Sequence, residues 1–395
     1  MGKRRIVIVG GVAAGTKAAA RARRCDPDAE ITLLEKGDLI SYAGCALPYY
    51  VSGAIADATE LVVTKADDFA VLRNVDVQTH SEVTAIDRAA KTVTVHRLLT
   101  GRTETVPYDY LVLTTGATPV LPPIEGRDLA GVYRMKEPSD ALRIRADLDA
   151  GRVQRAVIIG GGLIGLEMAE AFRAHGVRVA MVEMLDRVLA PFLDPEVAAL
   201  LHEHLRQQGV ELHLSERALR FEGDADGHVR RAITSGGELE ADLVLLAIGV
   251  RPNVALARDA GLAIGTTGAI AVDDHLRTSD PAIFAGGDCA ENTHLVTGRA
   301  VYAPLGSTAN KHGRVIGTNV AGGDETFPGV LGTMVVKVFA YNVGATVLSE
   351  MRATEAGFQT RTALIAGQDR AHNYPTHQPV VVKMVADAST SRVLG

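Results

Sequence analysis

Ile6-Val7-Ile8-Val9-Gly10-Gly11-Val12-Ala13-Ala14-Gly15 stands near the start of the chain, and an alanine- and arginine-rich stretch follows it to about Arg24. A short β-branched run is typical of a strand buried on both faces, and the glycines after it predict a tight turn into a helix. Ile31–Glu35 has the composition of the next strand. This opening segment therefore predicts a βαβ unit with a glycine turn.

The same order recurs in the middle of the chain. Ala156–Ile159 precedes Gly160-Gly161-Gly162-Leu163-Ile164-Gly165, a helical pattern continues to about His175, and Arg178–Glu183 reads as a strand. The second turn is a full G-x-G-x-x-G, whereas the first has Val12 at the middle glycine position. The repeat predicts two dinucleotide-binding domains in one chain.

Each glycine turn is expected to bring backbone N–H groups at a helix N-terminus close to a pyrophosphate. Glu183 ends the strand after the second turn, and Glu35 holds the corresponding place after the first. A carboxylate there accepts hydrogen bonds from a ribose diol and repels a 2′-phosphate, so the second turn predicts NADH rather than NADPH. The alternative is a strand-to-helix turn that binds no nucleotide. This alternative applies more to the first turn, because Val12 replaces the middle glycine there.

Further strands are expected around these two units. In Val75–Val95, apolar and polar residues alternate as they do in antiparallel strands. After about Phe327 the sequence predicts strands with little helix, which suggests a third domain. Three apolar runs end in glycine and predict buried strands: Leu111–Gly116, Asp242–Gly249 and Ala282–Gly287.

Composition excludes several classes of protein. Hydrophobic residues make up 47% of the chain and charged residues 22%, which indicates a globular protein. The net charge of −6 gives no field that favours nucleic acid as a partner, and no run of eighteen apolar residues predicts a membrane span. Three widely spaced cysteines favour a reducing cytoplasm over a disulfide framework.

Cys45 lies in Ser41-Tyr42-Ala43-Gly44-Cys45-Ala46-Leu47-Pro48-Tyr49, with no second cysteine near it. The sequence predicts that it occupies the first turn of a helix, where free N–H groups stabilise a thiolate. Because a protein dithiol is absent, any covalent intermediate must involve a group from outside the chain. Cys25 and Cys289 are predicted to be buried and unreactive.

These motifs together resemble the FAD-dependent pyridine nucleotide-disulfide oxidoreductases over nearly the whole chain. Within that family the chain is similar to the single-cysteine branch, which contains coenzyme A-disulfide reductases, persulfide reductases, NADH oxidases and NADH peroxidases. The motifs that carry the resemblance are the first glycine turn, the Cys45 segment, Thr114-Thr115-Gly116-Ala117-Thr118-Pro119, Ala247-Ile248-Gly249-Val250-Arg251-Pro252-Asn253 and Phe284-Ala285-Gly286-Gly287-Asp288-Cys289-Ala290.

The resemblance implies an α/β fold of two Rossmann-like three-layer domains and a C-terminal α+β interface domain. Residues 1–118 and 251–325 would form the FAD-binding domain, residues 119–250 the NAD(H)-binding domain, and residues 326–395 the domain for homodimerisation. Relatives continue past the equivalent of Gly395, so this last domain is expected to be incomplete.

The resemblance also assigns cofactor contacts, with Asp288 hydrogen-bonded to the ribityl chain of FAD. The residues implied for FAD are Gly10, Val12, Ala14, Gly15, Glu35, Lys36, Thr115, Gly116, Gly287 and Asp288. Those implied for NADH are Gly160, Gly162, Ile164, Gly165, Glu183 and Gly249. No metal is expected.

The implied activity is NADH-dependent reduction of coenzyme A disulfide, or of related small disulfides or persulfides, through Cys45. Coenzyme A contacts are implied for Lys17, Arg21 and Arg24, which share one helix face, and for Ser41, Arg73 and Asn310; a solvated basic face is the alternative. Tyr374 resembles a tyrosine that reaches the partner subunit's site and protonates the leaving thiolate. A packed aromatic is the alternative, and Asn373-Tyr374-Pro375-Thr376 departs from the family pattern.

Three other functions remain open. The first is an NADH oxidase that forms water or peroxide, although Ala13 occupies the position where oxidases and peroxidases of the branch have a histidine. The second is an electron-transfer flavoprotein reductase for a small iron–sulfur protein, which would not need Cys45. The third is a non-catalytic protein that binds both nucleotides and reports redox state to a partner.

Overall fold

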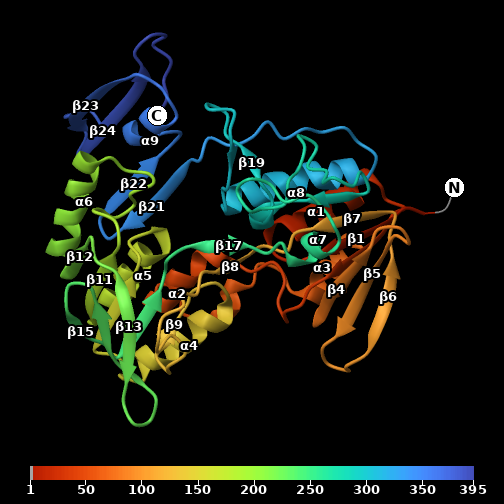
Figure 1. The fold of residues 1–395 in the computed structure, drawn as a ribbon, viewed down its shortest axis with the longest axis horizontal. Coiled ribbons are helices and arrows are strands. Elements are labelled where there is room, and N and C mark those ends of the chain that lie inside the picture. The colour runs from red at the N-terminus through yellow and green to blue at the C-terminus, as the bar shows by residue number, and fades with distance from the viewer. Residues whose placement is uncertain (1–2) are drawn as a thin grey trace. The chain divides into compact units, whose positions relative to one another are not determined.

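The structure, a computed structural model, describes residues 3–395 and divides into two compact units. Unit 1 holds the N-terminal segment to Leu47, Asp57–Thr118 and Val250–Val330. Unit 2 holds Pro48–Ala56, Pro119–Gly249 and Leu331–Gly395. Each unit is built around one parallel sheet, as the repeat in the sequence predicted (Figure 1).

Unit 1 contains a five-stranded parallel sheet in the order β18-β7-β1-β2-β3. In its centre, β1 (Arg5–Val9) lies between β2 (Glu30–Leu34) and β7 (Tyr110–Leu113). Val9 pairs with both Leu34 and Leu113, so these strands end at the same edge of the sheet. Three segments therefore begin at this edge of the sheet: the first glycine turn after β1, the chain that leads to Cys45 after β2, and the segment after Leu113.

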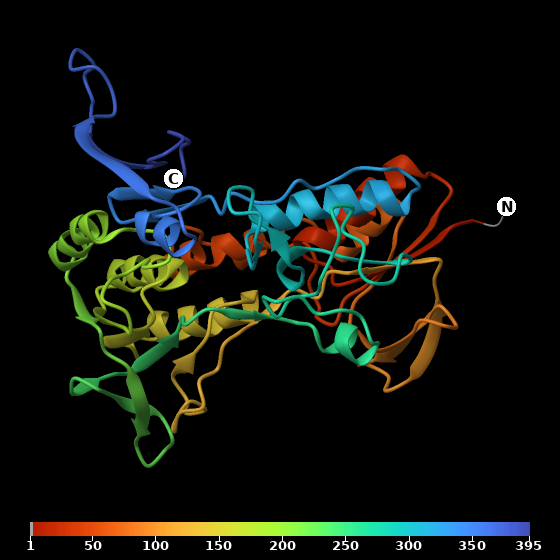
Figure 2. The ribbon, with the colours of Figure 1, turned by 45° about the horizontal axis from the view of Figure 1, so that its top comes forward.

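Both faces of β1 are buried, because its β-branched residues alternate between two layers. Ile6 and Ile8 pack toward α1 (Ala13–Cys25) and α8 (Gly306–Val320). Val7 and Val9 pack toward a three-stranded antiparallel sheet of β4 (Ser81–Asp87), β5 (Thr92–Arg97) and β6 (Thr103–Pro107). Helices α1 and α8 lie side by side in both views (Figures 1 and 2). Full burial of each such side chain contributes about 1.5–3 kcal/mol.

The prediction of antiparallel strands over Val75–Val95 is right for β4 and β5 and wrong for β3 (Asp76–Gln78). β3 pairs in parallel with β2, with Gln78 beside Leu34. The remaining elements of unit 1 are three 3₁₀ turns (Gly44–Ala46, Ala58–Leu61, Gly287–Cys289), α3 (Ala66–Arg73), β8 (Ala117–Pro119, ending at the first residue of unit 2), β17 (Val250–Pro252), α7 (Ala255–Asp259), β18 (Ile283–Ala285), β19 (Asn292–Thr293) and β20 (Ala300–Val301).

Unit 2 contains a second parallel sheet in the order β12-β11-β10-β16-β9. β10 (Arg155–Ile159) pairs with β11 (Arg178–Glu183) and with β16 (Leu243–Leu246). One face packs on the antiparallel sheet of β13 (Ala218–Gly223), β14 (Val229–Thr234) and β15 (Glu238–Glu240). The second glycine turn therefore leaves the centre of its sheet just as the first does.

The C-terminal part of unit 2 consists of two hairpins and a short helix, which confirms strands with little helix after Phe327. They are β21 (Met334–Val338), β22 (Tyr341–Ala345), α9 (Glu350–Glu355), β23 (Thr360–Gln368) and β24 (Pro379–Asp387). The other elements of unit 2 are α2 (Leu47–Ser52, which begins at the last residue of a unit 1 segment), β9 (Val132–Tyr133), α4 (Pro138–Asp149), α5 (Leu163–Ala174), α6 (Pro195–Gln207) and β12 (Val210–Leu214). Across the described chain, residues 3–395, each helix is too short or too polar to cross a bilayer.

Candidate active site

The first glycine turn joins β1 to α1 and is closed by backbone contacts that exclude side chains. Gly10 has φ +102°, and a Cβ there would lie 2.2 Å from the carbonyl oxygen of Thr114. Glu35 follows β2, and its carboxylate accepts hydrogen bonds from Gly11 N–H at 2.6 Å and from Gly37 N–H at 2.8 Å. The carboxylate is thus fixed beside the turn, and its other lone pairs can accept further hydrogen bonds.

The second glycine turn repeats this construction in unit 2. Gly160 has φ +110°, and Glu183 accepts hydrogen bonds from Gly161 N–H at 2.7 Å and from Leu185 N–H at 2.8 Å. A Cβ at Gly162, the residue before α5, would meet only open space. The turn is therefore open where the free N–H groups of α5 begin, which suits an anionic ligand.

Two other predicted cofactor segments of unit 1 begin at the ends of neighbouring strands. Thr115 follows β7, and its hydroxyl donates to the Asn253 carbonyl at 2.7 Å, while the Asn253 amide donates back to the Thr115 carbonyl at 2.8 Å. Asp288 lies in the 3₁₀ turn Gly287–Cys289 after β18. Because β18, β7, β1 and β2 are parallel neighbours, these segments and the first glycine turn share one edge of the sheet.

The predicted cofactor residues differ in how exposed they are. Ala14, Gly15 and Gly287 are buried, and the others are half-buried: Gly10, Val12, Glu35, Thr115, Gly116 and Asp288. Lys36 is exposed, and its ammonium group pairs with Glu82 at 2.7 Å. In unit 2, Gly162 and Ile164 are half-buried, and Gly249 has φ +98°.

Cys45 is exposed and lies in the 3₁₀ turn Gly44–Ala46, immediately before α2. The segment that carries it is tied to the first glycine turn, because Ser41 N–H donates to the Gly11 carbonyl at 2.9 Å. Ser41 has φ +51°, a left-handed conformation that is uncommon for serine. Cys45 follows only four residues later, so its Cα lies within about 14 Å of the Cα of Ser41.

The other two cysteines differ from each other. Cys289 is buried, its thiol contacts the carbonyls of Leu113 and Gly286, and burial raises its pKa, which confirms the prediction of an unreactive thiol. The prediction of burial is wrong for Cys25. This residue ends α1, where the helix leaves the sheet, and its side chain is exposed.

The basic residues predicted for coenzyme A lie mainly on α1. Lys17 and Arg24 are exposed. Arg21 is half-buried, since its Nε donates to Thr318 at 2.9 Å and its guanidinium lies 3.9 Å from Glu325. Asn310 is exposed on the neighbouring helix α8, and Arg73 is exposed at the end of α3. Lys17 and Arg24 are therefore more available than Arg21.

Tyr374 lies in unit 2, in the connection between β23 and β24, and is 56% exposed. Within the single chain its ring is therefore not buried. The exposed position leaves its phenol accessible to another molecule.

Glu167 is a candidate that the sequence analysis missed. It lies on α5, two residues after Gly165, and burial together with the charge of Glu170 raises its pKa to about 7. A carboxyl group that titrates near neutrality at the start of a nucleotide-binding helix is a functional candidate. The spacing G-x-G-x-x-G-x-E was its only signal in the sequence.

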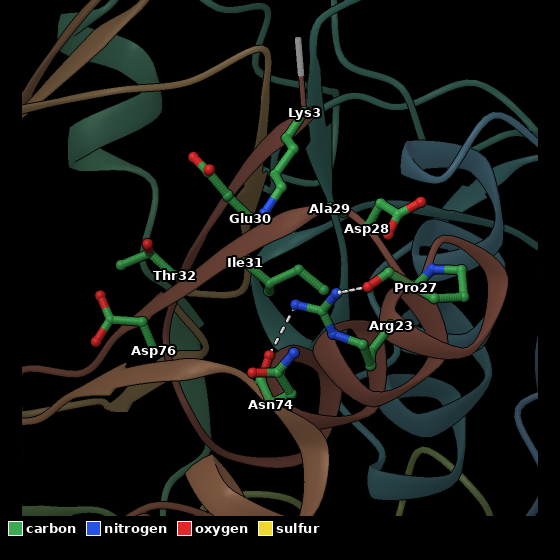
Figure 3. Close-up of a pocket in the computed structure, with 10 residues that line it drawn as sticks. All are labelled: Lys3, Arg23, Pro27, Asp28, Ala29, Glu30, Ile31, Thr32, Asn74 and Asp76. Carbon is green, nitrogen blue, oxygen red and sulfur yellow. Dashed lines mark hydrogen bonds between the residues drawn. The ribbon is translucent and has the colours of Figure 1, made fainter.

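A surface cavity of about 560 Å³ lies elsewhere in unit 1 (Figure 3). It is lined by the amino ends of the strands rather than by their carboxyl ends, and it mixes Lys3 and Arg23 with Asp28, Glu30 and Asp76. Arg23 donates there to the carbonyls of Pro27 and Asn74. The cavity is thus at the edge of the sheet opposite to the glycine turn and is not the cofactor site.

Comparison with known proteins agrees with this geometry. Residues 4–310 match the family model described as pyridine nucleotide-disulphide oxidoreductase. An NAD(P)H sulfur oxidoreductase (CoA-dependent) from Pyrococcus abyssi is 42% identical over 393 residues, covering 100% of this chain and 86% of the relative. An NADH oxidase from Enterococcus faecalis is 35% identical over 392 residues, covering 99% and 87%.

Among solved structures, an NAD-dependent persulfide reductase from A. fulgidus is 43% identical with a TM-score of 0.96, and the match covers 99% of this chain and 72% of that one. The likeness thus extends over both glycine turns, the Cys45 segment and the C-terminal hairpins. The chain belongs to the pyridine nucleotide-disulphide oxidoreductase family.

Proposed function

We propose that this protein is an NADH-dependent flavoprotein that reduces coenzyme A disulfide, or related small disulfides or persulfides, through Cys45. The observation that carries the proposal is the exposed Cys45 thiol on a segment hydrogen-bonded to the first glycine turn through Ser41 and Gly11. The sulfur-reducing relatives at 42% and 43% identity support it.

The residues of unit 1 fit FAD. The Gly10 turn leaves no room for a side chain, Glu35 presents oriented acceptors for a ribose, and a Cβ at Gly116 would meet open space. Gly10, Val12, Ala14, Gly15, Glu35, Lys36, Thr115, Gly116, Gly287 and Asp288 would hold the cofactor. Bound FAD would supply two-electron transfer between a nicotinamide and sulfur.

The residues of unit 2 fit NADH by the same argument, with Gly160, Gly162, Ile164, Gly165, Glu183 and Gly249 as contacts. The domain assignment follows: residues 1–118 and 251–325 serve FAD, residues 119–250 serve NADH, and residues 326–395 form the interface domain.

Glu183→Gln is expected to raise the ratio of kcat/KM for NADPH over NADH by on the order of tenfold, because it removes a charge that repels a 2′-phosphate. Glutamine keeps one oxygen that can accept the Gly161 N–H, whereas the Leu185 N–H loses its acceptor. The matched control is Glu35→Gln, which changes the equivalent carboxylate of the first turn. An unchanged ratio in Glu183→Gln, or an equal rise in both variants, would contradict the assignment.

Cys45 acts in this proposal as the nucleophile. Its thiolate attacks one sulfur of the substrate disulfide, a mixed disulfide forms with Cys45, and the other half leaves as a thiolate. Two electrons that originate from NADH then cleave the mixed disulfide, which releases the second thiol and restores Cys45. Tyr374 of the partner subunit in a homodimer would protonate a leaving thiolate.

The exposed basic residues Lys17 and Arg24 would bind the phosphates of coenzyme A, with Arg21, Ser41, Arg73 and Asn310 as further contacts. The double variant Lys17→Ala/Arg24→Ala is expected to raise KM for coenzyme A disulfide by on the order of tenfold. The control substrate is the disulfide of the pantetheine arm without its nucleotide, for which KM should not change. An equal rise with both substrates would exclude a phosphate contact.

A homodimer is proposed from the C-terminal hairpin. Four large apolar side chains on β23 and β24 are about half exposed, which suits an interface: Leu364, Ile365, Val382 and Met384.

The cysteines are few and dispersed along the chain, which favours a cytoplasmic location.

An NADH oxidase is the second candidate, because relatives at 35% identity carry that name. Ala13 at the head of α1 argues against it, since it offers no acid or base beside the turn. Oxygen uptake per NADH oxidised, measured without any disulfide, distinguishes the two. Uptake that accounts for all the NADH oxidised at the rate seen with coenzyme A disulfide would favour the oxidase.

A further inference from the structure

His312 is a buried titratable residue to which the proposed chemistry gives no role. It lies on α8 with no exposed surface, and its Nδ1 accepts a hydrogen bond from Gly287 N–H at 3.1 Å. The ring proton therefore belongs on Nε2, which has no hydrogen-bond partner among residues 3–395. The ring stands perpendicular to Phe327, with 4.5 Å between centroids.

The charge state of His312 follows from its surroundings. Burial lowers its pKa to about 4, so the ring is neutral at physiological pH. A neutral imidazole is required here, because a protonated ring would present N–H groups on both sides and could not accept from Gly287.

The turn that His312 holds is the one that carries Asp288. Gly287 has φ +76°, and a Cβ at Gly286 would lie 2.6 Å from Ile316 Cδ1 and 3.0 Å from His312 Cβ. Helix α8 therefore packs directly against the backbone of this turn. The bond from Gly287 N–H to His312 fixes the Gly286–Gly287 peptide and so restrains the turn from which Asp288 follows.

We propose that His312 is a positioning residue, which fixes the Gly287 N–H and thereby orients Asp288 toward the ribityl chain of FAD. This inference rests on the proposed FAD binding of unit 1. His312 acts through the backbone of the turn and contributes no proton to the reaction.

The experiment compares His312→Leu with His312→Asn in the full-length protein. The two side chains have nearly the same shape, and only asparagine offers an acceptor oxygen near the place of Nδ1. FAD affinity is measured by fluorescence titration of the deflavinated proteins, and the visible absorption spectrum of the bound flavin is recorded. The control is His202→Leu, because His202 is also buried and accepts a backbone N–H, that of Val188 in unit 2, at 3.2 Å.

We expect His312→Leu to weaken FAD binding about tenfold, the size of one buried hydrogen bond lost, and to shift the flavin spectrum. His312→Asn should stay within about threefold of the parent, and His202→Leu should leave FAD affinity unchanged. Parental affinity in His312→Leu, or equal weakening in His312→Leu and His312→Asn, would overturn the inference. A parent protein that binds no FAD would instead overturn the proposed function.

Discussion

Replacement of Cys45 by serine is expected to lower NADH-driven reduction of coenzyme A disulfide by at least about a thousandfold while FAD stays bound. A serine hydroxyl does not ionise near neutral pH and cannot form the mixed disulfide that the exchange requires. Cys45 is exposed in a 3₁₀ turn, so the substitution disturbs no packed core.

The rate of NADH oxidation with coenzyme A disulfide as the acceptor checks this prediction, together with the flavin absorbance of the purified variant. Cys25→Ser is the matched control, since Cys25 is also an exposed thiol of unit 1 but lies at the far end of α1. The control should keep the parental rate. Parental turnover in Cys45→Ser would refute the mechanism.

Replacement of Lys383 by methionine is expected to destabilise unit 2 by about 3 kcal/mol. Lys383 lies on β24 with only 7% of its side chain exposed, and its ammonium nitrogen is within 3.0 Å of carboxylate oxygens of Asp194, Glu196 and Glu350. These carboxylates come from the start of α6 and from α9. The substitution would leave their charges crowded together without a cation.

The pH dependence of this effect follows from the same contacts. Burial acts to raise the pKa of Asp194, but hydrogen bonds from Glu350 N–H and Lys383 hold it below its ordinary value. The bond from Lys383 also lowers the pKa of Glu196. This stabilisation is present above about pH 4 and is lost as the pH falls through the lowered values. Burial alone would lower the pKa of Lys383, but the three carboxylates raise it, so its contribution is complete below about pH 10.

Urea unfolding at pH 7 and at pH 3 tests the prediction. The parent should lose stability on acidification, and the difference between parent and Lys383→Met should shrink at pH 3. Lys337→Met is the control, because Lys337 is half exposed and Glu170 is its one ion-pair partner among residues 3–395, and it should cost at most about 1 kcal/mol. A cost for Lys383→Met no larger than that of Lys337→Met would show that the cluster is unimportant.

The central strands and glycine turns could be predicted because their signals are local. β1 and β10 are short runs rich in β-branched residues, β11 is a short apolar run, and Gly10 and Gly160 have the positive φ that glycine adopts readily. The motif of Thr115 and the turn of Asp288 were also located correctly at strand ends. They meet at one edge because the strands are parallel, a property of topology that the family resemblance implied.

What the sequence analysis missed depends on contacts between distant segments. Cys25 was expected to be buried, yet it is the last residue of α1, beyond the part of the helix that packs on the sheet. Arg21 forms contacts with Thr318 and Glu325, which lie far along the chain. His312 and Lys383 gain their roles only when α8 meets the Gly287 turn and when β24 meets α6 and α9. These partners are distant in the sequence, so no local sequence pattern predicts them.

Peptide mass spectrometry after one reaction with substrate tests the central claim most directly. The protein, with Cys45 as the free thiol and its flavin oxidised, is mixed with one equivalent of coenzyme A disulfide and digested without reductant. A second sample receives NADH before digestion, and the two are compared. A single coenzyme A moiety on the peptide that contains Cys45, lost after NADH, is the predicted result. No adduct, an adduct on Cys25 alone, or an adduct on Cys45 that persists after NADH would contradict the account.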